Sequence, residues 1–477
     1  MNRSGGTITA LFVALSGCVT APPVEPPTLD VATPESWTAR DDTTETPHSA
    51  WWNDFGDSNL DDAVESALNQ NYDLQAAVSR LDQALADSRI AGADLQPTLQ
   101  LGLNGAKQKR NFIGFPIPGS EDRVLSTVFT NYGVSLDVAW EPDVWGRLRA
   151  GARAALADLQ SRAADLRGAQ LSLAGQTTKA WFAIAETRQQ LRLATASVES
   201  FRISSDQVRQ RFEQGLRPSL DVRLALSNLA SAEALREQRG QQLDASLRQL
   251  EVLVGRYASG TVASPAVLPT APETIPGGLP SELVRRRPDL VAAERRIAAA
   301  SQRLQVARRD LYPSFSLTAN TGTATSALTD LIDGNFGVWS LLSNVLQPIF
   351  QGGRLRANID RAEARAAEEL ALYANTALVA FSEVETALAA EAFLAERERY
   401  LQISAEQSRA AETLADDRYR SGLDNYITVL ESQRLALQTE SDLITARRQR
   451  LENRVDLYLA LGGGFGLPGS AVPDTLE

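Results

Sequence analysis

Two proline-free stretches of 67 residues, 147–213 and 354–420, constrain the fold of this chain most strongly. Within both, apolar or small residues recur at alternating steps of three and four, a repeat of 3.5 residues that is typical of coiled coils. A helix of 67 residues is roughly 100 Å long at 1.5 Å per residue, several times the usual length. The sequence therefore predicts an elongated protein. The recurring positions are Ile184, Thr187, Leu191, Ala194, Val198, Phe201, Ser205, Val208 and Phe212, and then Leu370, Ala374, Ala377, Phe381, Val384 and Leu388.

The chain is also an internal duplication. Three pairs of unrelated motifs occur in the same order in both halves, two of them at an offset of 207 residues to within a few and the third at 216. A repeated order of motifs indicates two copies of one unit. The pairs are DLQPTLQL (94–101) with DLYPSFSL (310–317), WEPDVWGRLRA (140–150) with LQPIFQGGRLRA (346–357), and RFEQGLRPSLDV (211–222) with RYRSGLDNYITV (418–429).

Each copy contains two candidate strands before its long helix. Apolar and polar residues alternate over about 97–107, 128–140 and 313–323, and less clearly over 336–348. A length of nine to eleven residues crosses a bilayer when the strand is tilted. Four strands do not close a barrel, and an open edge in lipid leaves backbone groups unpaired, so we expect oligomerisation. Twelve strands from three copies suit a pore better than eight from two. The alternative is a soluble four-stranded sheet covered by helices.

Glycine turns are expected to end both long helices. Gly215 and Gly422 stand where a left-handed cap stops a helix, and return helices are predicted over about 219–256 and 424–461. A helix over 289–310 leads into the third strand and one over 58–92 into the first. The predicted division is a first repeat over 51–257, a connector over 258–287, a second repeat over 288–464 and a tail over 465–477.

The N-terminus predicts a lipid anchor. A short apolar run precedes Leu15-Ser16-Gly17-Cys18, which resembles a bacterial lipobox. Residues 1–17 are then a signal peptide, Cys18 is lipidated, and the proline-rich segment 18–50 is an extended tether. Val19 after the cysteine favours the outer membrane, by resemblance. The alternative is an ordinary signal peptide with a chance cysteine.

The composition excludes several classes of function. Met1, His48 and Cys18 are the only methionine, histidine and cysteine of the chain. Catalysis by cysteine or histidine and the binding of soft metal ions therefore lack the side chains they need. We find no phosphate-binding glycine loop, and we expect neither an enzyme nor a bound cofactor. A net charge of −12 argues against nucleic acid as a partner.

Several motifs together carry a family resemblance. WWNDFGDSNLDDAVESALNQNYDLQAA (51–77), RRRPDLVAAERRIAAA (285–300), PIFQGGRL (348–355) and RYRSGLDNY (418–426), with WEPDVWGRLRA, resemble the TolC/OprM-like outer membrane factors, and the NodT-type lipoprotein branch in particular. The resemblance covers nearly all of the mature chain, with the motifs in the expected order. It implies a homotrimer with a twelve-stranded outer-membrane β-barrel, four strands per chain, continuous with a coiled-coil periplasmic tunnel. It also implies outer-membrane lipid, a periplasmic adaptor and an inner-membrane pump, expected to be of the RND type, as partners in small-molecule efflux.

The resemblance also assigns site residues. It maps a periplasmic gate onto Ile427, Glu431 and Arg434, which steps of four and three place on one helix face. Three copies of Glu431 would form an acidic ring that favours cations. The alternative is a solvated Glu–Arg pair on a coiled coil. Asp221 is the equivalent in the first copy, and this inequality suggests that opening moves mainly the second helix pair. The expected adaptor contacts are the tip turns Gly215, Leu216, Arg217, Gly422, Leu423 and Asp424.

Two other functions stay open at this point. The same tunnel would serve type I protein secretion, with an ABC transporter in place of the pump. A structural coiled-coil lipoprotein of the outer membrane would explain Cys18 and the heptads, but it does not explain the four alternating strands.

Overall fold

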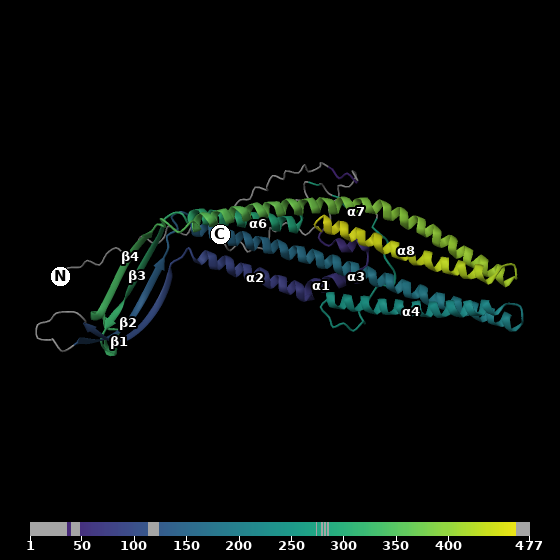
Figure 1. Cartoon of the computed structure of the whole chain (residues 1–477), viewed down its shortest axis with the longest axis horizontal. Coiled ribbons are helices and arrows are strands. Elements are labelled where there is room, and N and C mark those ends of the chain that lie inside the picture. The colour runs from purple at the N-terminus through teal and green to yellow at the C-terminus, as the bar shows by residue number, and fades with distance from the viewer. Residues whose placement is uncertain are drawn as a thin grey trace.

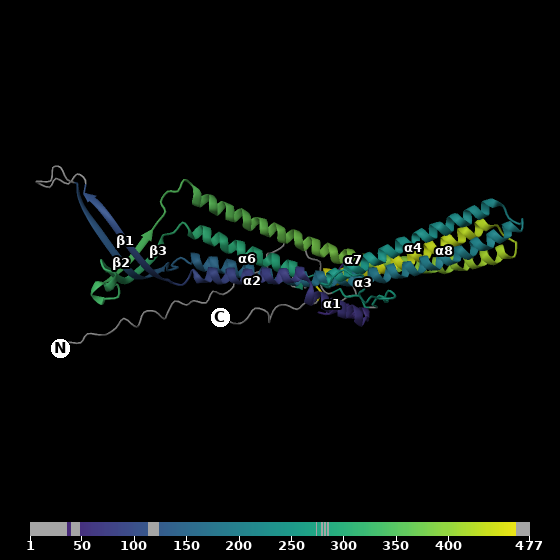
Figure 2. The same cartoon turned by 90° about the horizontal axis from the view of Figure 1, so that it is seen from below.

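The computed structural model describes residues 36–39, 48–112, 124–272, 274–277, 280, 283 and 286–463. The molecule is long, with a β-sheet at one end and two helical turns side by side at the other (Figures 1 and 2). The predicted signal peptide, Cys18, most of the tether and the tail over 465–477 lie outside the described residues.

The two longest helices confirm the prediction from the proline-free stretches. Helices α3 (Arg147–Glu213) and α7 (Arg354–Arg420) are each 67 residues long. Helices α4 (Ser219–Leu253) and α8 (Tyr426–Ala460) return along them, so that α4 packs on α3 and α8 packs on both α7 and α3. No helix in the described part of the chain is long and apolar enough to cross a membrane.

The helices before the strands differ between the two copies. Helix α6 (Pro288–Arg309) is continuous and packs between α3 and α7 near the sheet. The expectation of one helix over 58–92 was wrong, because the chain forms α1 (Ser58–Gln70) and α2 (Tyr72–Ala93) with an extended residue, Asn71, between them. The Asn71 side chain accepts a hydrogen bond from the Leu74 N–H and donates one to the Leu253 carbonyl, both at 3.0 Å. It therefore begins α2 and caps the end of α4, a role that depends on tertiary contact.

The sheet has four antiparallel strands in the order β1-β2-β3-β4. They are β1 (Thr98–Phe112), β2 (Leu125–Trp140), β3 (Ser314–Thr325) and β4 (Gly337–Leu346). Strands β1 and β2 have 15 and 16 residues, longer than the nine to eleven expected, because the β1–β2 hairpin continues beyond the ends of β3 and β4. β1 and β4 are open edges, and every residue of β4 is exposed in the single chain.

The two faces of the sheet differ in polarity. The register places Leu99, Leu101 and Leu103 of β1 on one face, with Val138, Leu136 and Val134 of β2 opposite them. The other face carries Asn104, Asp137 and Asn320, and the Ser135 Oγ donates to Asp137 Oδ2 at 2.7 Å. Leu342 and Leu346 of β4 lie on this polar face, which explains the poor alternation in the fourth strand.

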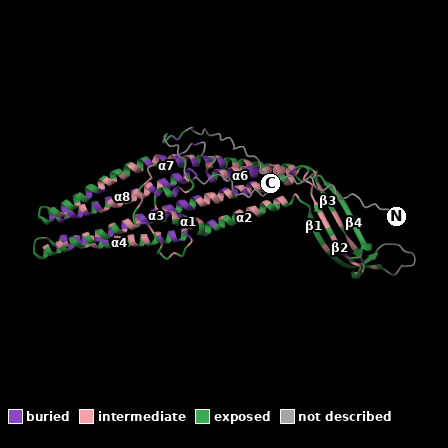
Figure 3. Ribbon diagram, turned by 180° about the vertical axis from the view of Figure 1, so that it is seen from behind, coloured by how far each residue is buried: buried purple, intermediate pink, exposed green. Residues whose placement is uncertain are grey.

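Buried residues gather along the middle of the helices, while β1 and β4 are exposed and many residues of β2 and β3 are only partly exposed (Figure 3). The largest cluster holds Trp51, Phe55 and Tyr458 together with Trp181 and Phe182 of α3. The rings of Trp51 and Tyr458 stack with centroids 5.0 Å apart. Residues before the first repeat's helices thus pack against the last helix of the second, and this contact joins the two copies into one body.

Candidate functional site

The turns at the far ends of α3 and α7 have the same backbone geometry. Gly215 and Gly422 have φ of +74° and +76°, a conformation that favours glycine. The Gly215 N–H donates to the Phe212 carbonyl at 2.8 Å and the Leu216 N–H donates to the Arg211 carbonyl at 2.8 Å. Gly422 and Leu423 make the equivalent bonds to Tyr419 and Arg418 at 3.0 and 2.9 Å. Both turns are therefore Schellman caps, as the glycines predicted.

Each turn also presents one leucine to solvent. The residue after the capping glycine often covers the last turn of its own helix, but Leu216 and Leu423 are 67% and 68% exposed. Capping therefore accounts for Gly215 and Gly422 and leaves the two leucines without an internal role.

Two arginines of the first turn bind the second turn. Arg211 donates to the carbonyl oxygens of Tyr419 and Arg420, each at 2.9 Å, and its guanidinium carbon lies 4.6 Å from the centre of the Tyr419 ring. Arg217 donates to the Asp424 carbonyl at 3.3 Å and lies 5.0 Å from the same ring. The carbonyls at a helix C-terminus carry partial negative charge, which suits a cation. Arg217, one of the predicted adaptor contacts, therefore also joins the two hairpins.

The second turn does not return these contacts. Arg418, the counterpart of Arg211, donates to the Asp424 carboxylate at 2.5 Å within its own hairpin. Tyr419 is 2% exposed, whereas its counterpart Phe212 is 42% exposed. The duplicated positions thus have different roles. The sequence differences that accompany them are Phe212 to Tyr419 and Arg217 to Asp424, the residue that holds Arg418 within its own hairpin.

Ile427, Glu431 and Arg434 share one surface of α8, as the spacing predicted. All three are exposed, while the opposite side of the helix is buried through Tyr426, Val429, Leu430, Gln433 and Ala436. In the described part of the chain Glu431 and Arg434 form no ion pair with each other.

Asp221 lies elsewhere. It is 9% exposed and sits in the seam between the hairpins rather than on the surface that carries Glu431. Burial, followed by the neighbouring Tyr419 and Asp221, raises the pKa of Tyr426 far above its ordinary value. The described residues supply no hydrogen-bond partner to the hydroxyls of Tyr419 and Tyr426. The structure thus brings Asp221 to Tyr426 and does not bring it to Glu431.

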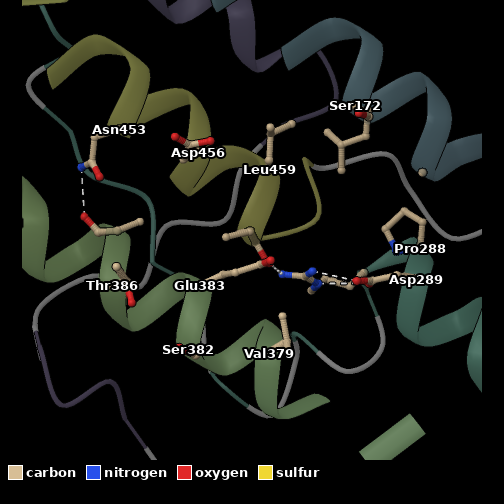
Figure 4. A pocket seen from close by; sticks show the side chains of 15 residues that line it. Ser172, Pro288, Asp289, Val379, Ser382, Glu383, Thr386, Asn453, Asp456 and Leu459 are labelled. Atoms are coloured by element: carbon tan, nitrogen blue, oxygen red, sulfur yellow. Dashed lines mark hydrogen bonds and ion pairs between the residues drawn. The ribbon is translucent and has the colours of Figure 1, made fainter. Parts of the chain in front are cut away.

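A cavity of about 630 Å³ lies between α3 and α7, where the start of α6 meets the end of α8. Asp289 and Glu383, both labelled in Figure 4, accept hydrogen bonds from the guanidinium of Arg287. That guanidinium donates to Asp289 at 2.7 Å, to Glu383 at 2.6 Å and to the Ala460 carbonyl at 3.0 Å. Pro288 and Asp289 stand in the first turn of α6, where they favour a helix start, whereas the reach of Arg287 to α7 and α8 has no local signal in the sequence. Because Arg287 pairs with these acidic side chains, its charge links the start of α6 to α7 and α8, and we assign this cavity a structural role.

The described residues contain no group of three or more histidine, cysteine or acidic side chains that would hold a metal ion. The helical tips present the exposed leucines Leu216 and Leu423 to solvent beside charged residues.

Comparisons with known proteins agree along nearly the whole chain. A family model described as outer membrane efflux protein matches residues 63–256 and 279–463. The pyoverdine export outer membrane protein OpmQ of Pseudomonas putida is 33% identical over 462 residues, which cover 95% of this chain and 96% of OpmQ. The outer membrane protein OprJ of Pseudomonas aeruginosa is 33% identical over 471 residues, which cover 98% of this chain and 97% of OprJ.

Solved structures show the same fold. The outer-membrane channel OprN superimposes with a TM-score of 0.84 at 29% identity, covering 94% of this chain and 99% of that one. The open state of the MtrE outer membrane channel of Neisseria gonorrhoeae superimposes with a TM-score of 0.80 at 27% identity, covering 94% and 98%. On the strength of the family match and of these relatives, the chain belongs to the outer membrane efflux protein family.

Proposed function

We propose that three copies of this chain form a closed duct that carries small molecules from the periplasm through the outer membrane. The observation that carries the proposal is a four-stranded sheet with two open edges, one apolar face and one polar face, joined to helices of 67 residues. Such a sheet satisfies its backbone in lipid only when β1 of one copy pairs with β4 of the next. Twelve strands enclose a water-filled interior, which eight do not.

The helices extend the duct on one side of the membrane. Helices α3, α4, α7 and α8 lead away from the sheet and end at the paired tips (Figure 2). We place these tips in the periplasm, where a periplasmic adaptor contacts Leu216 and Leu423 together with the adjoining turn residues. An inner-membrane pump, of the RND type in our proposal, delivers the substrate. The chain then acts as a passive exit with no catalytic role.

The substrate class follows from relatives. OpmQ is named for pyoverdine export and a further relative, TtgF of Pseudomonas putida, for toluene efflux. These names favour small molecules over secreted proteins as the substrates of the duct. A purely structural lipoprotein does not fit a chain of the efflux family.

Deletion of the gene tests the duct. We expect sensitivity to some members of a panel of antibiotics, dyes, solvents and metals, restored by the full-length gene. A strain whose susceptibility is unchanged throughout, and whose secreted proteins are lost instead, would favour the secretion function. Purified protein that forms no trimer and no conducting pore in planar bilayers would overturn both.

We propose that Ile427, Glu431 and Arg434 line the closed periplasmic mouth. Their exposure on one surface of α8 supports this, since a tunnel lining must face water. Asp221 then lies behind this lining, in the seam with Tyr426. Replacing Glu431 or Arg434 with alanine should raise the resting single-channel conductance, and the Glu431 change should also weaken cation preference. Conductance and ion selectivity equal to the unaltered protein in both variants would argue against the gate.

We also propose that Cys18 carries a lipid that anchors the chain in the outer membrane. Several acyl chains anchor a protein stably, whereas one does so only marginally. Membrane fractionation of a Cys18→Ser variant tests the anchor's contribution. A variant that is still lipid-labelled would refute the assignment, and one that loses the label but stays in the outer membrane would show that the barrel suffices.

A further inference from the structure

Lysine is rare in this chain and its placement is uneven. Arginine supplies nearly all of the 47 basic residues, and lysine occurs only at positions 107, 109 and 179. Lys107 and Lys109 are both on β1 and both exposed. Residues two apart on a strand point to the same side, so these two side chains share one face of the sheet.

That face is the apolar one. Leu99, Leu101 and Leu103 precede the lysines in the same alternating series, at the end of β1 nearest the helices. Under the proposed duct, on which this inference rests, this is the lipid-facing side. Asp137 is the only acidic residue of β1 and β2, and it belongs to the opposite face. Within the described residues neither lysine has an ion-pair partner, so two positive charges on this face are not compensated.

Aromatic residues mark the two borders of the apolar region. Trp140 and Tyr132 of β2 lie on the same face, eight residues apart. At about 3.3 Å per residue and a tilt of about 40°, they differ by roughly 20 Å in height. Outer-membrane barrels have an apolar band about 25 Å tall with aromatic girdles at both borders. Trp140 therefore corresponds to the periplasmic girdle and Tyr132 to the outer one.

The lysines come directly after the outer border. Tyr132 pairs with Gly105, and a Cβ at Gly105 would lie 3.3 Å from the Tyr132 ring, so the ring covers this part of β1. Lys107 pairs with Thr130 and Lys109 with Val128, one and two steps farther out. These steps are about 5 Å each in height, which puts both ammonium groups among the headgroups of the outer leaflet. Pairing of β1 with another copy adds a neighbour in the plane of the sheet and leaves this face free.

We propose that Lys107 and Lys109 form a binding site for the anionic headgroup of an outer-leaflet lipid, one that carries phosphate or carboxylate groups. The charge is complementary and the level matches the headgroup region. A long lysine stem can cover apolar surface while its ammonium group reaches the headgroups. Lysine is a compact charge with three rotatable donors, suited to a mobile headgroup, whereas many arginines of the helices form fixed ion pairs. The site ties the duct to the leaflet through which it opens.

The test is native mass spectrometry of the full-length protein in detergent, titrated with lipid A bearing two phosphates and, separately, with phosphatidylcholine. A lysine near an anionic headgroup layer contributes a factor of about five, so Lys107→Gln with Lys109→Gln should weaken lipid A binding about 30-fold. Phosphatidylcholine binding should not change. The Lys107→Arg and Lys109→Arg pair should retain most of the affinity, and higher salt should weaken it.

Lys179→Gln is the matched control, because Lys179 lies on α3 and pairs with Asp456 of α8. Equal lipid A binding by the unaltered protein and the double glutamine variant would overturn the inference, as would an equal loss for phosphatidylcholine. Inorganic phosphate that competes at millimolar concentration would show a site for a free anion rather than a lipid, which also overturns it. Conductance of the same samples in planar bilayers tests the duct separately, since an unaltered protein without a pore refutes the proposed function whatever the lipid result.

Discussion

Arg211 should hold the two tip hairpins together, and replacing it with glutamine should loosen them. The side chain donates two hydrogen bonds to carbonyls of the opposite hairpin and lies over the Tyr419 ring at 4.6 Å. A partly exposed, charge-assisted hydrogen bond contributes about 1 kcal/mol, and a cation–π contact at an exposed site contributes about 0.5 to 1 kcal/mol. The change should therefore cost about 2 to 3 kcal/mol, a factor of about 30 to 150 in the ratio of parted to joined hairpins.

Arg418→Gln is the control that the duplication supplies. Arg418 occupies the equivalent place in the second copy but pairs with Asp424 in its own hairpin, so its loss leaves the contacts between hairpins in place. Arg211→Lys keeps the charge without the planar fork and should give an intermediate effect.

Single-channel recording in planar bilayers measures the outcome. Arg211→Gln should raise the time spent in higher-conductance states by at least tenfold, with Arg418→Gln near the unaltered protein. Thermal unfolding should shift little, because the tips lie far from the main core. If the two glutamine variants behave alike, the asymmetry between the copies does not control opening and the reasoning fails.

Three further predictions concern stability and assembly. Glu391→Ala should destabilise the fold by about 3 to 5 kcal/mol, because it leaves the 1% exposed Arg454 without its acidic partner; thermal denaturation measures the loss, and adding Arg454→Met should restore part of it. Gly322→Ala should abolish assembly, since its Cβ would lie 2.0 Å from the Val134 carbonyl oxygen, whereas Gly334→Ala meets nothing within 4 Å and should assemble normally on size exclusion. Asp143 is desolvated, but hydrogen bonds from the Arg149 and Leu148 N–H groups hold its pKa below the ordinary value of an aspartate. Its stabilising effect should be complete above about pH 4 and decline as the pH falls through the lowered folded-state pKa, so acid unfolding of Asp143→Asn should lack this component, and identical profiles would contradict it.

The divergence of the two copies bears on how the mouth opens. The first hairpin contributes Arg211 and Arg217 to the contact, and the second contributes the buried Tyr419 and the backbone carbonyls that they bind. Glu431 and Arg434 lie on the second hairpin only. A movement that parts the hairpins breaks contacts made by the first and displaces the charged surface of the second, in line with the prediction that opening moves mainly the second pair.

The sequence alone determined the features that local chemistry controls. Helices α3 and α7 end just before Gly215 and Gly422, because glycine readily adopts the left-handed conformation that caps a helix. Neither helix contains a proline that would end it earlier. Alternation revealed three strands clearly, because side chains on successive residues face opposite sides. The shared surface of Ile427, Glu431 and Arg434 also followed from helical spacing alone.

Only the tertiary structure decided which surfaces meet. Asn71 breaks an otherwise continuous helical pattern because its amide reaches the end of α4, and no local pattern encodes a partner 182 residues away. Asp221 is buried where the two hairpins pack against each other, whereas Thr428, at the equivalent position of the second copy, is exposed. Equivalent positions in a duplicated sequence therefore lie in different surroundings. Arg211 and Arg418 show the same effect, since one reaches across to the other hairpin and the other stays within its own. Side-chain type and spacing are properties of the sequence, whereas the partner of a long arginine depends on which carbonyls and carboxylates the folded chain brings within reach.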